Sequence, residues 1–394
     1  MQDFLPPFDN SFAVGLAKLL VPLAQSMHKL EIRVSPRCKQ LVETYAPKHT
    51  VIAANHSDRF DPLCAYALAK DCTEEFYFLA SREQFDQNFG FSGWLMQQVG
   101  TYSVIRGRKV DVPSAEKTID ILVEGKRNLV QFPEGDVTGR NDVILPLKKD
   151  GMRNMFEAQR RLLTTGESLY VLPVAMYYQV KSDAIPAMNR SIVQLERWLN
   201  LPVFTGSESQ REQRIKRLVF GFIEHQTKFY GVQVEKDQSL SDQLRSISRA
   251  ISTNTASANN VEYDADENEA LLLYGVRAEL KDPRNSDLDR AEQLLILAST
   301  LENQTVTDEI AWRVLDRLEK ELTGKVTNKG NRIAFIDAAP PVDLKPLYPQ
   351  FIQDQVGAMA ELDAQVRASL TELMQQMQTL DVTPGLVHAG SERV

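Results

Sequence analysis

An apolar run that stops abruptly at polar residues constrains the fold more than any other stretch of this chain. Thr50–Ala54 is apolar and partly β-branched, which predicts a short buried strand. After it, Asp61 and Pro62 have the form of a helix N-cap with proline at the first helical position, ahead of the apolar Leu63–Ala69. We therefore expect His56 in a strand-to-helix connection at the carboxyl end of a strand, where open α/β sheets place their sites.

The spacing of His56 and Asp61 favours acid–base chemistry. A turn lets a carboxylate five residues further along fold back against the imidazole, hold its tautomer and make it a general base. Such a pair does not require a serine or cysteine, so the nucleophile would come from the substrate. The alternative is that Asp61 only caps the helix and His56 is an ordinary loop histidine, because an H-x4-D spacing also arises by chance. This stretch alone leaves both interpretations open.

Composition limits the class of protein. The chain has 394 residues, of which 43% are hydrophobic and 25% charged, and these values are typical of a globular protein with two or three domains. A net charge of −8 argues against nucleic acid as a main partner. Cys38, Cys64 and Cys72 lack the spacing of a zinc site or a disulfide framework, so we expect no metal and a reducing, cytoplasmic setting.

The segment Phe12–Ala24 is the longest apolar stretch, but it is too short for a transmembrane helix and contains Lys18 and Pro22. Its hydrophobic residues fall near helical spacing, which predicts an amphipathic helix. Such a helix either packs on the domain that follows or lies in a membrane interface, and the pattern alone favours packing.

Short apolar strands alternate with amphipathic helices through the first part of the chain. Strand patterns near residues 75–80, 100–105, 128–132 and 168–178 follow the one at 50–54, with helical patterns between most of them. This alternation predicts an α/β fold with a mostly parallel sheet flanked by helices. Arg106 and Glu134 each follow a strand, as His56 does, so we expect the three side chains along one edge of the sheet.

Beyond Val180 the pattern is helical until Asn331–Asp337, which is typical of a single strand. A lone strand leaves its backbone groups unpaired, so we expect it to rejoin the first sheet. The predicted organisation is an N-terminal amphipathic helix (1–30), an α/β domain (31–182), a large helical insertion (183–328), a closing strand of the α/β domain (329–346) and a C-terminal helical tail (347–394).

Four short blocks occur in order along the chain, at or near predicted strand ends. They are Asn55-His56-x4-Asp61-Pro62, Gly100-x5-Arg106, Phe132-Pro133-Glu134-Gly135 and Leu172-Pro173-Val174. Each block is weak alone, but together they resemble the glycerolipid acyltransferases, the PlsC-like family of lysophosphatidate and glycerol-3-phosphate acyltransferases with an HX4D motif. The resemblance covers about residues 45–180, together with the strand at 333–344 that resembles the family's closing strand.

The resemblance implies a role in phospholipid biosynthesis. His56 would be the general base and Asp61 its orienting carboxylate, with acyl-CoA or acyl-carrier-protein as donor and a glycerophosphate or lysophospholipid as acceptor. It implies no metal and no cofactor beyond the thioester co-substrate, and peripheral association with a membrane surface. The residues that would bind the acceptor are Asn55, Arg106, Glu134 and Gly135; a guanidinium suits the phosphate, and we expect Glu134 to orient Arg106 or the glycerol. For Arg106 the alternative is an ordinary surface salt bridge.

The chain departs from the family pattern at two places. Asp58 stands two residues after His56, where the family often has serine. The third block continues with Asp136 and Val137 where the family has threonine and arginine, and Arg140 is the candidate replacement for that phosphate-binding arginine.

Two other functions remain open at this point. One keeps the site but uses another donor or acceptor, as in transacylation between phospholipids or acylation of another lipid head. The other is a lipid- or protein-binding module with the same fold and no turnover. The intact pair of His56 and Asp61 argues against that module, whereas the missing third-block arginine argues for it.

Overall fold

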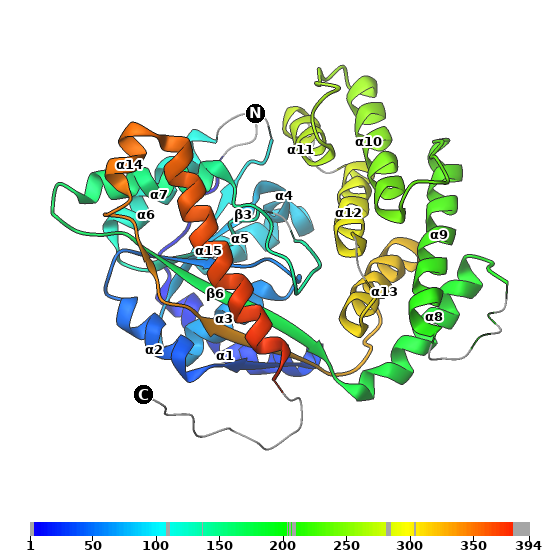
Figure 1. The fold of residues 1–394 in the computed structure, drawn as a ribbon, viewed down its shortest axis with the longest axis horizontal. Helices are drawn as coiled ribbons and strands as arrows, with labels where there is room; N and C mark the ends of the chain where they lie inside the picture. The colour runs from blue at the N-terminus through cyan, green and yellow to red at the C-terminus, as the bar shows by residue number, and fades with distance from the viewer. Residues whose placement is uncertain are drawn as a thin grey trace.

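The sheet at the centre of the molecule has eight strands (Figure 1). The computed structural model describes residues 4–107, 111–135, 137–202, 204, 206, 210–280, 285–302 and 305–380. The strands are β1 (Leu30–Val34), β2 (Thr50–Ala54), β3 (Phe76–Ser81), β4 (Thr101–Val104), β5 (Asn128–Gln131), β6 (Tyr170–Val180), β7 (Arg332–Ala338) and β8 (Val342–Asp343). Their order is β1-β7-β6-β2-β5-β3-β4, and β8 pairs with β6.

Five of these strands run in the same direction. β2 is parallel to β5 and β6, and β3 is parallel to β4 and β5. Their carboxyl ends therefore lie along one edge of the sheet. β7 runs antiparallel to β6, and β1 is parallel to β7. The expected α/β fold with a mostly parallel sheet is confirmed, whereas the edge strand β1 was not anticipated from the sequence.

Helices cover both faces of the sheet, and therefore alternate side chains of β2 are buried on opposite sides. Val51 and Ala53 pack toward α6 (Val112–Glu124), α7 (Lys149–Leu162), α14 (Tyr348–Gln353) and α15 (Gln355–Gln378). Ile52 and Ala54 pack toward α2 (Pro36–Tyr45) and α3 (Asp61–Asp71). Burial on both faces explains the continuous apolar run that identified this strand. Next to β3 and β4 lie α4 (Arg82–Phe85), the 3-10 turn η1 (Gln87–Gly90) and α5 (Phe91–Gln98).

The helices between β6 and β7 form a body with its own hydrophobic core, to the right in Figure 1. They are the short η2 (Ser182–Ala184), α8 (Ile185–Trp198), α9 (Arg211–Tyr230), α10 (Leu240–Ala258), α11 (Glu269–Glu279), α12 (Ser286–Leu301) and α13 (Asp308–Thr323). The chain leaves the sheet at Val180 and returns at Arg332, which is the register partner of Val180 in the β6–β7 pair. The strand after the helices thus lies inside the first sheet, between β1 and β6.

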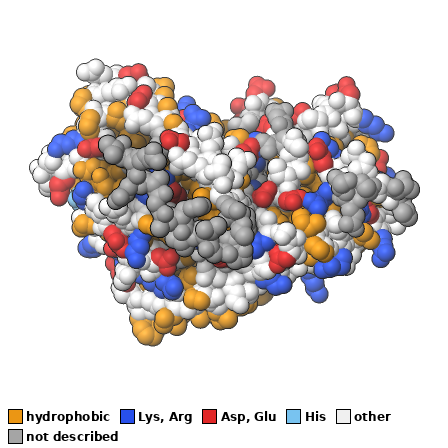
Figure 2. All heavy atoms as spheres, turned by 60° about the horizontal axis from the view of Figure 1, so that its bottom comes forward, with side chains coloured by type: hydrophobic (Ala, Val, Ile, Leu, Met, Phe, Trp, Pro, Cys, Tyr) orange, Lys and Arg blue, Asp and Glu red, His pale blue; other side chains and the backbone are white. Residues whose placement is uncertain are grey.

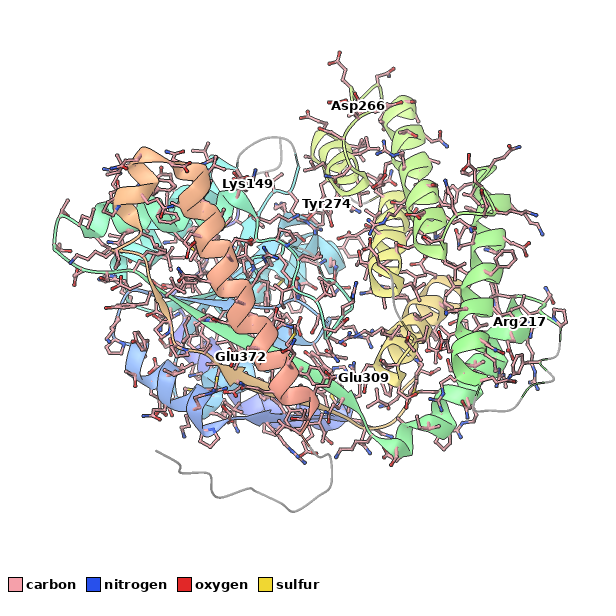
Figure 3. All side chains as sticks on the ribbon, viewed as in Figure 1. Lys149, Arg217, Asp266, Tyr274, Glu309 and Glu372 are labelled. Carbon is pink, nitrogen blue, oxygen red and sulfur yellow. The ribbon has the colours of Figure 1, made fainter. Side chains whose placement is uncertain are left out.

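Polar contacts hold this helical body against the sheet. The backbone N–H of Val180 donates to Glu309 at the start of α13, and Figure 3 shows Glu309 beside the end of β6. The fully buried ammonium of Lys329 donates to Asp316 and Glu319 of α13 at 2.6 and 2.7 Å. Ion pairs of buried Lys329 therefore join the segment just before β7 to α13, the last helix of the insertion.

The N-terminal helix α1 (Ser11–His28) packs on α3 and β1 through Val14 and Val21. Its opposite face leaves hydrophobic side chains in solvent: Phe12, Leu16, Leu19, Leu20, Leu23 and Met27 are exposed. Among the described helices, none combines the length and the apolar character that crossing a bilayer requires. Figure 2 shows acidic and basic side chains interspersed over one face of the molecule, with hydrophobic side chains gathered along its lower edge.

Phe156 on α7 stacks on Phe351 of α14, with ring centroids 4.3 Å apart and no solvent exposure of Phe156. Replacing Phe156 with alanine leaves a cavity between the two helices, so we expect the free energy of unfolding to fall by about 3–5 kcal/mol in urea denaturation. Phe12→Ala is the matched control, because Phe12 is 82% exposed, and it should change that free energy by less than about 0.5 kcal/mol. Equal effects of the two substitutions would contradict the packing described here.

Candidate active site

In the connection after β2, a side chain makes the hydrogen bonds that backbone groups make within the strand. β2 ends at Ala54, but the side-chain amide of Asn55 continues the ladder: its Nδ2 donates to the carbonyl of Met176, and its Oδ1 accepts from the backbone N–H of Met176 at 2.7 Å. Asn55 is buried. Its amide thus fixes the direction in which the chain leaves the strand, and its side chain is bonded to β6.

His56 and Asp61 are in direct contact. The distance between His56 Nδ1 and Asp61 Oδ2 is 2.8 Å, and a carboxylate acceptor assigns the proton to Nδ1. Nε2 then carries the lone pair, and it makes no hydrogen bond with the described residues. The ring stacks on Phe132, and 18% of the side chain is exposed. The arrangement therefore leaves Nε2 as a candidate proton acceptor on a partly exposed side chain.

Asp61 is fully buried and accepts from two further donors. The backbone N–H of Asp58 donates to the same oxygen as His56, and the Tyr178 hydroxyl donates to Oδ1 at 2.6 Å. The expectation that Asp61 is the helix N-cap is wrong. Phe60 occupies that position, Asp61 is the first residue of α3, and its carboxylate makes no capping bond because these three donors occupy it.

Tyr178 is a site residue that the sequence did not reveal. Burial raises the pKa of its phenol well above the usual value, and the charge of Asp61 raises it further, so the hydroxyl stays protonated and donates. The signal that could have found it is weak: a phenol near the end of the apolar run that forms β6.

Glu134 accepts hydrogen bonds that hold the loop between β2 and α3 (residues 55–60), which we call the His56 loop. Its Oε1 accepts from the backbone N–H of His56 at 2.8 Å, and its Oε2 accepts from that of Leu145 at 2.7 Å. Burial raises the pKa of the carboxyl to about 7, although both hydrogen bonds oppose the shift. We expected Glu134 to orient Arg106 or the glycerol. Both of its oxygens instead contact backbone, because the loop's N–H groups are buried and need acceptors.

The residues after Glu134 close the same loop. Gly135 has φ +79°, a backbone conformation that strains other residues, so the turn favours glycine. Asp136 lies outside the described residues. Thr138 donates to the His56 carbonyl from both its backbone N–H (2.7 Å) and its hydroxyl (3.1 Å). The backbone N–H of His56 is thus bonded to Glu134, and its carbonyl is bonded to Thr138.

Asp58 connects the His56 loop to the helical insertion. Its Oδ2 lies 2.7 Å from the Arg332 guanidinium on β7 and 3.7 Å from that of Arg313 on α13. Burial would raise the pKa of Asp58, but the charges of Arg332 and Arg313 outweigh it and lower the pKa to about 2. Asp58 is therefore the counter-ion of two buried arginines. It occupies a position where the family often has serine.

Arg106 follows the end of β4, which is three strand positions from β2, or roughly 14 Å along the sheet edge. Its guanidinium donates to the Tyr274 hydroxyl of α11 (2.9 Å) and to Glu292 of α12 (2.8 Å), and lies 4.0 Å from the Tyr274 ring centre. Figure 3 shows Tyr274 between the insertion and the α/β part. Arg106 thus shares the expected edge with His56, but it is paired with the insertion.

Arg140 also has a partner within the chain. Its guanidinium donates to both carboxylate oxygens of Asp142 and to the backbone carbonyl of Glu302 at the end of α12. Arg140, the candidate replacement for the arginine missing from the third block, therefore forms an ion pair with Asp142. Within the described ranges, no cluster of three or more histidine, cysteine, aspartate or glutamate side chains could hold a metal ion.

Removing the charge of Asp58 leaves Arg332 and Arg313 without this counter-ion. We expect Asp58→Asn to lower the free energy of unfolding by about 3–5 kcal/mol at pH 7, measured by urea denaturation. Because the pKa of Asp58 falls from 3.8 to about 2 on folding, its contribution is present above about pH 4 and is lost as the pH falls toward 2. Asp150→Asn, in an exposed pair with Arg153, should cost less than about 1 kcal/mol, and an equal cost would contradict the role of Asp58.

A family model described as Acyltransferase matches residues 37–177. The matched segment runs from α2 into β6 and contains His56, Asp61, Arg106 and Glu134, whereas the insertion helices and β7 follow it. A search of curated proteins finds no match to this chain.

Proposed function

We propose that this chain, whose residues 37–177 match the acyltransferase family, acts in lipid metabolism and esterifies a glycerophosphate or lysophospholipid. The donor would be an acyl thioester, either acyl-CoA or acyl-carrier-protein. The observation that carries this proposal is the 2.8 Å contact between His56 Nδ1 and Asp61, on a histidine whose side chain is 18% exposed.

In the proposed reaction, Nε2 of His56 takes the proton of the acceptor hydroxyl while its oxygen attacks the thioester carbonyl. The tetrahedral intermediate then breaks its carbon–sulfur bond, and the leaving thiolate takes the proton from the imidazolium. The products are an ester and a free thiol, and no acyl-enzyme forms. A positioned base of this kind contributes about 10²–10⁴-fold to the rate.

Asp61 stabilises the imidazolium that forms during the transfer. Hydrogen bonds from Asp58 N–H and Tyr178 hold its carboxylate in place, so little reorganisation is needed when the charge appears on His56. Asn55, Glu134 and Gly135 act as positioning residues in this proposal, because their contacts shape the loop that carries His56.

Arg106 remains the proposed contact for the anionic end of the acceptor. Its position on the carboxyl edge of the sheet supports this role, because an arginine side chain and a glycerophosphate can together span the gap from His56. An acceptor phosphate would share or replace the bond that Arg106 makes with Glu292.

Replacing the base or its orienting carboxylate tests the proposal. We expect His56→Ala and Asp61→Asn each to lower kcat at least about 100-fold, measured as thiol release from acyl-CoA and acyl-carrier-protein with glycerol 3-phosphate, lysophosphatidate and other lipid acceptors. Circular dichroism should show an unchanged fold for His56→Ala. His225→Ala is the matched control: His225 lies on α9 against Trp198, and its loss should leave turnover within about twofold. Full turnover by His56→Ala would refute the assigned base.

We also propose that the enzyme docks on a membrane surface through α1 and the neighbouring α4–α5 region. Phe89, Phe91, Trp94 and Leu95 are exposed there. The two surfaces adjoin, because the segment before α1 runs along α5: the Phe8 N–H donates to the Gln97 carbonyl, and Asn10 donates to Gln98. Exposed hydrophobic side chains on neighbouring helices are what interfacial helices present to lipid.

Two acidic substitutions on α1 test the docking surface. Leu19→Asp combined with Leu23→Asp replaces side chains that are 75% and 57% exposed, so the fold should be retained. We expect co-sedimentation with phospholipid vesicles to fall at least about tenfold, because each buried leucine contributes about 1.5–3 kcal/mol. Phe229→Asp, at a 64% exposed position on α9, is the control and should not change binding. Unchanged binding by the α1 variant would exclude α1 from the docking surface.

A further inference from the structure

Arg317 on α13 is a half-buried guanidinium that forms no ion pair with the described residues. It donates to the neutral side chain of Gln293 on α12. Desolvating a guanidinium without a counter-ion is costly. The basic side chains nearby do not share this property: Arg313 and Arg332 pair with Asp58, Arg59 pairs with Asp316, and Lys329 pairs with Asp316 and Glu319.

Arg317 lies on the insertion helix that contacts the His56 loop. It follows Arg313 by four residues on α13, so the two side chains share one face of the helix, and Arg313 reaches the His56 loop through Asp58 and the Gly139 carbonyl. Its partner Gln293 is the neighbour in sequence of Glu292, which holds Arg106.

The charged groups that shift the pKa of Arg317 agree with its location on α13. Burial lowers the pKa of Arg317, the charge of Arg59 lowers it further, and the carboxylates of Asp58 and Glu292 act in the opposite direction. The charged groups that act on Arg317 thus include Asp58 of the His56 loop and Glu292, the partner of Arg106.

The third block of this chain departs from the family at the position of a phosphate-binding arginine. Val137 stands where the family has a phosphate-binding arginine, and Arg140 is held by Asp142. We propose that Arg317 binds a phosphate group of a substrate, so that the helical insertion supplies the cation missing from the third block. This inference rests on the proposed acyl transfer. The phosphate belongs either to the glycerophosphate acceptor or to the thioester donor, and the chemistry of recognition is the same.

A guanidinium suits this task in a partly desolvated place. It has five N–H donors in a planar fork, and it can keep its bond to Gln293 while presenting others to phosphate oxygens. A bound phosphate would also supply the counter-ion that Arg317 lacks.

Arg317→Gln tests the inference by kinetics. We expect the KM for the phosphate-bearing substrate to rise about 10- to 100-fold while kcat stays within about threefold. The acceptor arm compares lysophosphatidate with monoacylglycerol, and the donor arm varies acyl-CoA and acyl-carrier-protein. A KM increase for lysophosphatidate alone assigns the phosphate to the acceptor, and one for the thioester assigns it to the donor. Unchanged KM in both arms overturns the inference.

Arg290→Gln is the matched control, because the Arg290 guanidinium on α12 is already bound to Glu321 and the Tyr230 hydroxyl. It should leave both KM values unchanged, and an increase equal to that of Arg317→Gln would overturn the inference.

Thermal unfolding with inorganic phosphate gives a readout that does not depend on turnover. Phosphate should raise the Tm of the wild-type protein and not that of Arg317→Gln, whereas equal stabilisation of both would refute the site. Without phosphate the variant should be at least as stable as the wild type, because it loses an uncompensated charge, and a lower Tm would count against this account. If no acceptor supports acyl transfer but phosphate still stabilises only the wild type, the proposed function fails and the phosphate site stands.

Discussion

The buried carboxylate of Asp61 is the point on which the site depends. It accepts from His56 Nδ1, from the Asp58 backbone N–H and from the Tyr178 hydroxyl, and it has no exposure to water. A buried carboxylate is stable only when such donors replace its hydration. These donors come from the loop after β2 and from β6, so the base can be oriented only when the neighbouring strands are in register. The hydrogen bonds of Asn55 to β6 and of Glu134 to the His56 N–H secure that register.

The helical insertion is built into this arrangement. It leaves the sheet at the end of β6 and returns along β7, so its first and last residues lie beside the strand that carries Tyr178. Asp58 binds arginines from β7 and α13, Arg106 binds α11 and α12, and Arg140 reaches the end of α12. Each of the three thus ties a loop at the carboxyl edge of the sheet to the insertion. The insertion therefore shapes the part of the site where the acceptor's anionic end is proposed to bind.

Local patterns were sufficient for much of the fold. Strands buried on both faces produce continuous apolar runs, and amphipathic helices produce the 3.6-residue period, so both types of element could be predicted. The single strand at the end of the helical region could be assigned to the first sheet, because an isolated strand leaves its backbone unpaired. β1 was missed although its five residues, Leu30–Val34, alternate apolar and charged side chains, which is the period of a strand. The pair of His56 and Asp61 was predictable because its members are separated by a single turn.

The sequence by itself determined the class of fold, the pairing of His56 with Asp61, and the order in which polar residues follow the strands, because these depend on short-range periodicity and spacing. Only the tertiary structure decided what each polar side chain contacts. Tyr178 reaches Asp61 from 117 residues away, Arg332 reaches Asp58 from 274, and Glu292 reaches Arg106 from 186. A buried charge or amide takes the partner that packing brings within hydrogen-bond distance, and no local pattern specifies that partner. For this reason the sequence could not reveal that Asn55 and Glu134 bond to backbone groups around the loop, or that Arg317 of the insertion forms no ion pair with the described residues.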